Sequence, residues 1–166
     1  MADHRDTLGE IYAGWEHYQS HLIEALTPLT SGQLALQAAP HLRSIGALAA
    51  HIVGARARWL KNFLNEGGAD LTPLTLYGAP DQPRPTAAEL VSGLQVTWAV
   101  MAAALARWSA DDLAESFTRE RARTRGGETA TLSRRWVVWH LIEHDLHHGG
   151  EMFYTLGMHG LPTPDI

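Results

Sequence analysis

The stretch "VVWHLIEHDLHHGGEM", residues 137–152, has an apolar pattern with the period of an α-helix. Residues spaced by three or four positions fall on one face of such a helix. One line of this kind contains Val137, Leu141, His144, His148 and Met152. Two histidines therefore lie within the apolar stripe that faces the core. The stretch predicts a buried helix that carries polar groups on its inner side.

Three further segments have the same helical periodicity, at about residues 4–26, 44–66 and 86–108. Ser44 is predicted to cap the second helix, and Thr86 with Glu89 forms a capping-box pattern at the third. The fourth helix is expected to begin at about residue 131 or 133 and to end at 156, before Gly157. These patterns predict an all-α four-helix bundle.

Two of the expected connections are long. Residues 67–85 contain four prolines and are long enough to cross a helix length of about 30 Å. The second and third helices are therefore free to run parallel, unlike neighbours in a tightly connected bundle. The segment 109–132 alternates in character and contains Gly126 and Gly127, which predicts a small hairpin before the last helix.

The composition sets limits on function. The chain has 166 residues, of which 45% are hydrophobic and 19% charged, as expected for a single soluble domain over residues 1–166. A net charge of −5 gives no support to a general nucleic-acid role. The absence of cysteine excludes disulfides, thiolate metal sites and a cysteine nucleophile, and it fits a cytoplasmic protein. We expect no signal peptide and no membrane span, because no apolar run is long enough.

The inward histidines predict a metal site. His144 and His148 are one helical turn apart, so their rings can converge on one ion, and the same holds for His140 with His144. His140 and His148 are about 12 Å apart along the helix and cannot both join one site with His144. In the second helix, His51 also faces the core. Three inward histidines from two helices are typical of a catalytic metal site with open positions.

Hydrogen-bonded core histidines are the alternative interpretation. Burying an imidazole without a partner costs about 1–3 kcal/mol for each unmet group, and one metal ion would satisfy three of them. We therefore favour the metal. His147 is expected to point outward or to support a ligand. His17 and His21 form another pair one turn apart, and we predict that both are exposed to solvent.

The segment "HLIEH" also matches the H-x-x-E-H pattern of inverted zinc proteases, with His140 and His144 as ligands and Glu143 as base. The motif is short, and such a protease needs a distal carboxylate ligand and a larger architecture. We regard it as the weaker alternative.

Three segments resemble the DinB/YfiT-like family of metalloenzymes: "SIGALAAHI" at 44–52, "WHLIEHDLHHGGEM" at 139–152 and "LGMHGLP" at 156–162. The resemblance extends over almost the whole chain. It implies a bundle with up-down-down-up topology and a metal triad of His51, His144 and His148. The family usually has Arg-Gly-Gln after the last ligand, where this chain has Gly149, Gly150 and Glu151.

The same resemblance implies a type of chemistry. Family members with known activity resemble S-transferases and isomerases that use a low-molecular-weight thiol such as bacillithiol or mycothiol, with zinc or nickel as the usual ion. A chain without cysteine suits an enzyme that borrows its nucleophile. A small-molecule hydrolase and a non-catalytic, metal-stabilised bundle remain as alternatives. Glu143, Asp145 and Glu151 are candidates for orienting the ligands or for catalysis.

Arginines gather between residues 119 and 135, and the first four alternate: Arg119, Arg121, Arg123 and Arg125. On an extended strand they would all point to one side. They are candidates for a rim that binds the anionic group of a thiol or substrate, and the alternative is a solvated hairpin face.

Trp136 and Trp139 lie about 100° behind and about 200° ahead of Val137 on the last helix, so at least one of them leaves the core. The family resemblance implies homodimers, and we predict a dimer that buries one of these tryptophans. The alternative is cover by the 109–132 segment of the same chain.

Overall fold

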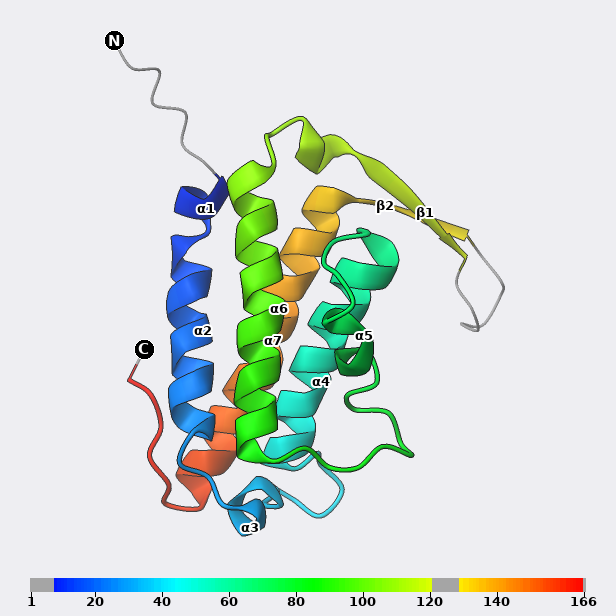
Figure 1. The fold of residues 1–166 in the computed structure, drawn as a ribbon. Coiled ribbons are helices and arrows are strands. Elements are labelled where there is room, and N and C mark those ends of the chain that lie inside the picture. Colours follow the sequence, from blue (N-terminus) through cyan, green and yellow to red (C-terminus); the bar gives the residue numbers. More distant parts are fainter. Residues whose placement is uncertain (1–7, 121–128, 166) are drawn as a thin grey trace.

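The computed structural model describes residues 8–120 and 129–165, and Figure 1 shows their fold. Four long elements form a bundle: α2 (Ala13–Leu26), α4 (Ile45–Ala57), α6 (Ala87–Arg107) and α7 (Arg134–Met158). The short elements are α1 (Leu8–Ile11), α3 (Ser31–Leu34), the π-helix η1 (Arg58–Phe63), α5 (Leu71–Leu74), the 3₁₀ turn η2 (Asp112–Ala114), and the strands β1 (Ser116–Glu120) and β2 (Thr129–Ser133). The predicted all-α four-helix fold is confirmed.

The helices follow the up-down-down-up order. α2 and α7 run in one direction, and α4 and α6 run in the other (Figure 1). The segment between α4 and α6, which contains α5, returns along the outside of the bundle and makes this parallel pair feasible. Arg58 anchors the segment by donating from Nη1 to the carbonyl oxygens of Thr75 and Tyr77, at 2.9 and 3.2 Å. Gly54 allows this segment to lie close against α4, because a Cβ at Gly54 would collide with the Tyr77 carbonyl.

Local signals fix most helix starts. Ser44 accepts a hydrogen bond from the Ala47 amide, and Thr86 with Glu89 forms a complete capping box. Ser133 caps α7 in the same way, so that helix begins one residue later, at Arg134. The first predicted helix is interrupted at Tyr12, between α1 and α2.

The predicted end of the last helix was wrong. α7 continues through Gly157 to Met158, and Gly160 is the residue with positive φ, at 67°. The amide of Gly160 donates to the Gly157 carbonyl and that of Leu161 to the Leu156 carbonyl, each at 3.0 Å. This is a Schellman motif, which needs its left-handed glycine after the C-cap, here His159.

The predicted hairpin before the last helix is confirmed. β1 and β2 pair antiparallel, with Ser116 opposite Ser133 and Glu120 opposite Thr129. The expected turn at Gly126 and Gly127 lies outside the described residues. The hairpin projects from the end of the bundle where α7 begins (Figure 1).

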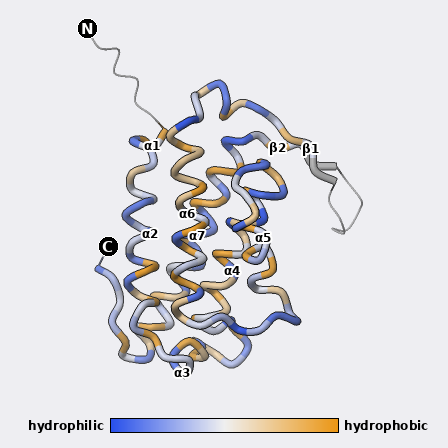
Figure 2. Tube along the Cα trace, in the orientation of Figure 1, coloured by the Kyte–Doolittle hydropathy of each residue, from blue (hydrophilic) through white to orange (hydrophobic). Residues whose placement is uncertain are grey.

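α6 is long and apolar enough to cross a membrane by length and composition alone, with a mean hydropathy of 1.4 over its most apolar window. Apolar residues follow both α4 and α6 in Figure 2. Leu90, Leu94 and Met101 of α6 are buried in the common core. These residues pack inside the helical bundle, and 39% of the most apolar window of α6 is buried.

Candidate metal centre

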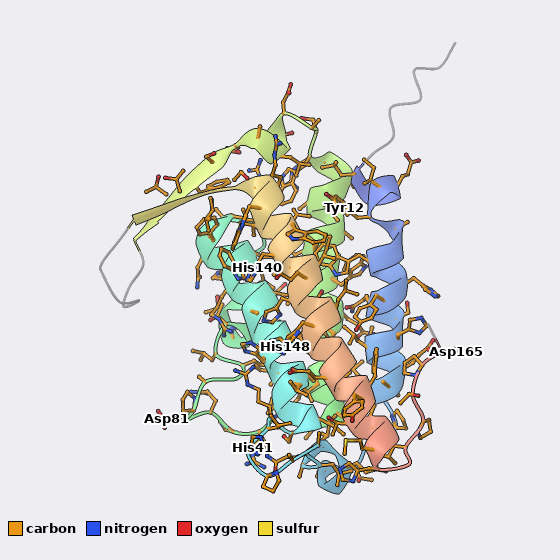
Figure 3. All side chains as sticks on the ribbon, turned by 180° about the vertical axis from the view of Figure 1, so that it is seen from behind. Tyr12, His41, Asp81, His140, His148 and Asp165 are labelled. Carbon is orange, nitrogen blue, oxygen red and sulfur yellow. The ribbon has the colours of Figure 1, made fainter. Side chains whose placement is uncertain are left out.

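His51 of α4 and His144 and His148 of α7 form a group that could hold a metal ion, with all candidate ligand atoms within 4.8 Å of one another. Nε2 of His51 and Nε2 of His144 are 3.1 Å apart. The ring centroids are 4.7 Å apart for His51 with either partner and 4.5 Å apart for His144 with His148. Figure 3 places His148 on the side of α7 that faces α4. Two helices thus supply three half-buried imidazoles to one point.

Burial keeps two of these imidazoles neutral. Loss of solvent lowers the pKa of His51 to about 4, and the charge of Arg43 adds to the effect. Loss of solvent, followed by the neighbouring His148, lowers the pKa of His144 to about 3. Neutral imidazole is the form that ligates metals, so both side chains are ready to bind at neutral pH without losing a proton.

Glu151 orients the third imidazole. Its carboxylate lies 2.7 Å from His148 Nδ1, one turn further along α7. This contact places the proton of neutral His148 on Nδ1, where it donates to the carboxylate, and leaves the Nε2 lone pair for a ligand. The exposed His147 is 3.6 Å from the same carboxylate, and His147, His148 and Glu151 form a second, more exposed group of potential ligands.

The donor set fits a divalent ion. Three nitrogen donors suit zinc and nickel, and three protein ligands leave room for a further one. His144 faces His51 with its Nε2, and its buried Nδ1 has no hydrogen-bond partner among the described residues.

His140 is placed differently. Its ring stacks on Trp136, with centroids 4.9 Å apart and an interplanar angle of 17°, and lies 6.0 Å from the His144 ring. Its Nδ1 is 3.7 Å from Glu143. Within residues 8–120 and 129–165, neither group of potential ligands includes His140 or Glu143. The structure thus brings together the triad implied by the family resemblance and not the pair required by the inverted protease motif.

Asp145 does not orient a ligand, contrary to the expectation. It is fully buried and accepts hydrogen bonds from Arg56, with Nη2 at 2.7 Å and Nε at 3.0–3.1 Å, and from Trp15 Nε1 at 2.7 Å. Gln19 completes the network by accepting from Arg56 Nη1 at 2.6 Å and donating to the Leu94 carbonyl at 3.0 Å. The network joins all four long helices.

The sequence contained a sign of this burial. Asp145 lies four residues after Leu141 and four before Gly149, both of which are buried. Gly149 itself packs against the ring of Tyr18, where a Cβ would collide with the hydroxyl. The position of Asp145 between these two buried residues therefore indicated a paired core residue rather than an exposed acid.

The prediction for His21 was also wrong. His17 is exposed, but His21 is only 8% exposed, and their Nε2 atoms are 3.1 Å apart. The buried side of α2 is wider than the Trp15–Leu22 line, because Tyr18 also packs inward and lies one turn before His21. The two imidazoles share one hydrogen bond through these Nε2 atoms, and the buried Nδ1 of His21 has no hydrogen-bond partner among the described residues, with Glu24 3.8 Å away.

Most of the arginines proposed as an anion-binding rim lie outside the described residues. The backbone of Arg119 belongs to β1, and its side chain lies outside the described residues, as do Arg121, Arg123 and Arg125. Arg134, from the same cluster, is buried and structural. It pairs with Glu115 at 2.6 Å and lies over the Trp108 ring.

Both tryptophans of interest leave the core, as predicted for at least one of them. Trp136 is 41% exposed and Trp139 is 61% exposed. The alternative that the 109–132 segment covers them is therefore not supported by the part of that segment that the structure describes.

The fold and the three-histidine cluster define a helical-bundle protein with a potential metal centre, and the comparisons identify its family and fold. The DinB family model matches residues 1–166, and the chain belongs to this family. A DinB-like protein from Bacillus cereus ATCC 10987 has a similar structure, with a TM-score of 0.70, 22% identity and coverage of 97% of this chain and 98% of that one. A DinB-like protein from Bacillus subtilis gives a TM-score of 0.62 at 16% identity, covering 94% and 96%. No curated protein matches the chain.

Proposed function

We propose that the protein is a metal-dependent enzyme that activates a low-molecular-weight thiol for S-transfer or isomerisation in the cytoplasm. The observation that carries the proposal is the convergence of His51, His144 and His148 at one half-buried point between α4 and α7. A divalent ion held there, zinc or nickel, would lower the pKa of a bound thiol and so provide a thiolate at neutral pH.

The chain's own residues prepare this step. The three imidazoles present lone pairs from two helices that the core holds in place, and Glu151 holds the Nδ1 proton of His148. His51 and His144 are both partly buried between α4 and α7, where burial lowers the pKa of each imidazole. The sequence has no cysteine, so the thiol must come from a co-substrate.

The test is consumption of a reactive electrophile by the zinc-loaded and the nickel-loaded protein. Bacillithiol, mycothiol and glutathione are each compared with a reaction that contains no thiol. We expect at least one thiol to give a rate well above the same mixture with metal-free protein. Turnover that needs the metal but no thiol would identify a hydrolase instead. If no turnover is found under any condition, the non-catalytic, metal-stabilised bundle is the remaining interpretation.

We also propose a homodimer formed through the outer face of α7. Trp139, Leu146 and Tyr154 are exposed at helical spacing along this face. Large exposed aromatic residues are enriched at interfaces. Sedimentation at micromolar concentration should show a dimer that Trp139→Ala weakens, whereas Gln95→Ala, at an exposed position of α6, is the control and should leave it unchanged. A monomer in the unmodified protein would contradict the proposal.

A further inference from the structure

A cavity of about 470 Å³ lies at the end of the bundle where α4 and α6 begin. Its volume is within the range of small-molecule sites. The segments before α4 and before α6 supply most of its lining, and Figure 3 labels His41 and Asp81 in these two segments. The cavity is separate from the histidine cluster, since none of the three histidines lines it.

The cavity nevertheless adjoins His51. Ser44 and Ala47 line it, and they precede His51 by seven and four residues on the same face of α4. Ala47 therefore lies about one helical turn, or about 6 Å of rise, before His51 on α4. Gly78 also lines it and contacts the His51 backbone, because a Cβ on Gly78 would lie 3.5 Å from the His51 Cα.

The charges that line the cavity are all positive. Arg43 and Arg84, both exposed to solvent, are among its lining residues, and among the described lining residues there is no Asp or Glu. Within the described part of the chain, neither guanidinium has an ion-pair partner. Glu89 lies close by but is committed to the α6 cap, bonded to the Thr86 amide and hydroxyl at 2.7 and 2.8 Å.

The remaining walls suit the carbon skeleton of a ligand. Leu34, Ala47 and Pro83 present apolar surface, and Ser44 and Gln82 add polar groups. Arginine side chains at one cavity are suited to a carboxylate, because their charge-assisted hydrogen bonds are roughly twice as strong as neutral ones.

We propose that this cavity binds the carboxylate end of a small organic substrate or thiol, with Arg43 and Arg84 as the anion-binding residues, while the reactive end of the ligand reaches the His51–His144–His148 cluster. The inference rests on the proposed function of that cluster. It places the anion site at the start of α4 rather than on the hairpin.

The test compares 6-mercaptohexanoate with its amide, 6-mercaptohexanamide, which has the same thiol and length but no charge. Calorimetry on the zinc-loaded protein should show the acid binding roughly tenfold tighter or more. In the Arg43→Ala/Arg84→Ala double variant this preference should fall to less than about twofold. Arg135→Ala removes an exposed arginine at the opposite end of the bundle and should retain it. Equal affinity for acid and amide in the unmodified protein, or equal weakening by Arg135→Ala, would overturn the proposal.

A second measurement separates this inference from the proposed function. Hexanoate and hexanamide, which carry no thiol, are titrated into metal-free His148→Ala protein. A preference for hexanoate that disappears in the arginine double variant supports the cavity site even if thiol turnover is never found. Absence of that preference would overturn the site even if turnover is found. Stronger competition by inorganic phosphate than by hexanoate would overturn the choice of a carboxylate.

Discussion

Two polar clusters lie between α4 and α7 and differ in how their groups are satisfied. In the first, Arg56 and Asp145 form a buried ion pair whose remaining groups bond to Trp15 and Gln19. In the second, His51, His144 and His148 converge, and His144 Nδ1 has no hydrogen-bond partner within residues 8–120 and 129–165. The two clusters are five residues apart on α4 and adjacent on α7.

The difference separates structure from function. The Arg56–Asp145 network is closed, so it holds the four long helices in one arrangement and offers nothing to a ligand. The histidine cluster is open, so the protein bears the cost of partly buried imidazoles at a place that a ligand can complete. The closed network also fixes the relative position of α4 and α7, on which the geometry of the open cluster depends.

The largest effect is expected from breaking the closed network. Asp145→Ala leaves the Arg56 guanidinium buried without its partner, which should lower the free energy of unfolding by about 3–5 kcal/mol. Urea denaturation followed by circular dichroism measures it. Glu143→Ala, an exposed acid two residues earlier on the same helix, should change stability by less than about 0.5 kcal/mol. Similar small losses in both variants would contradict the structural role of the network.

Substituting the histidines of the cluster should abolish metal binding rather than lower the stability of the metal-free protein. Elemental analysis of tag-free protein should find one divalent ion per chain, and His51→Ala and His148→Ala should each abolish it. Metal added at about 100 times its Kd should raise the free energy of unfolding of the unmodified protein by about 2.7 kcal/mol. It should not change the stability of either variant. His140→Ala is the matched control and should keep both properties. Retention of metal in both triad variants would disprove the site.

A smaller effect is expected at the group that orients His148. Glu151→Gln keeps the shape of the side chain but removes the charge that holds the Nδ1 proton, so the affinity for metal should fall by about tenfold. Competition with a chromogenic chelator measures the affinity. Glu143→Gln supplies the comparison, because Glu143 lies nearer to His140. An unchanged affinity in Glu151→Gln would show that the 2.7 Å contact does not support the ligand.

The smallest effect concerns acid stability of the metal-free protein. The folded-state pKa values of His51, about 4, and His144, about 3, lie below the unfolded value of 6.5. The unfolded chain therefore binds more protons below pH 6.5, and stability should fall as the pH drops from about 6.5 towards 4. His144→Ala should flatten this part of the profile. An identical slope in the variant would show that His144 is not neutral in the fold.

Much of the fold could be predicted because it is encoded locally. Ser44, Thr86 and the stripe through Val137 and Leu141 each act within one or two helical turns, and the structure has them where the sequence indicated. The long 67–85 connection likewise allowed the parallel pair of α4 and α6. The end of α7 was missed because Gly157 and Gly160 are equivalent by composition, and only the backbone shows which one takes positive φ.

The sequence by itself determined the four long helices, the Ser44 and Thr86 caps and the inward direction of His144 and His148, because these follow from spacing along one chain segment. Only the tertiary structure decided that Asp145 belongs to Arg56, 89 positions away, and that His21 is covered. It alone decided that Arg43 and Arg84 share one cavity beside His51. The reason is physical: helical periodicity sets which side of a helix a residue occupies, but the partner on that side depends on how the helices pack.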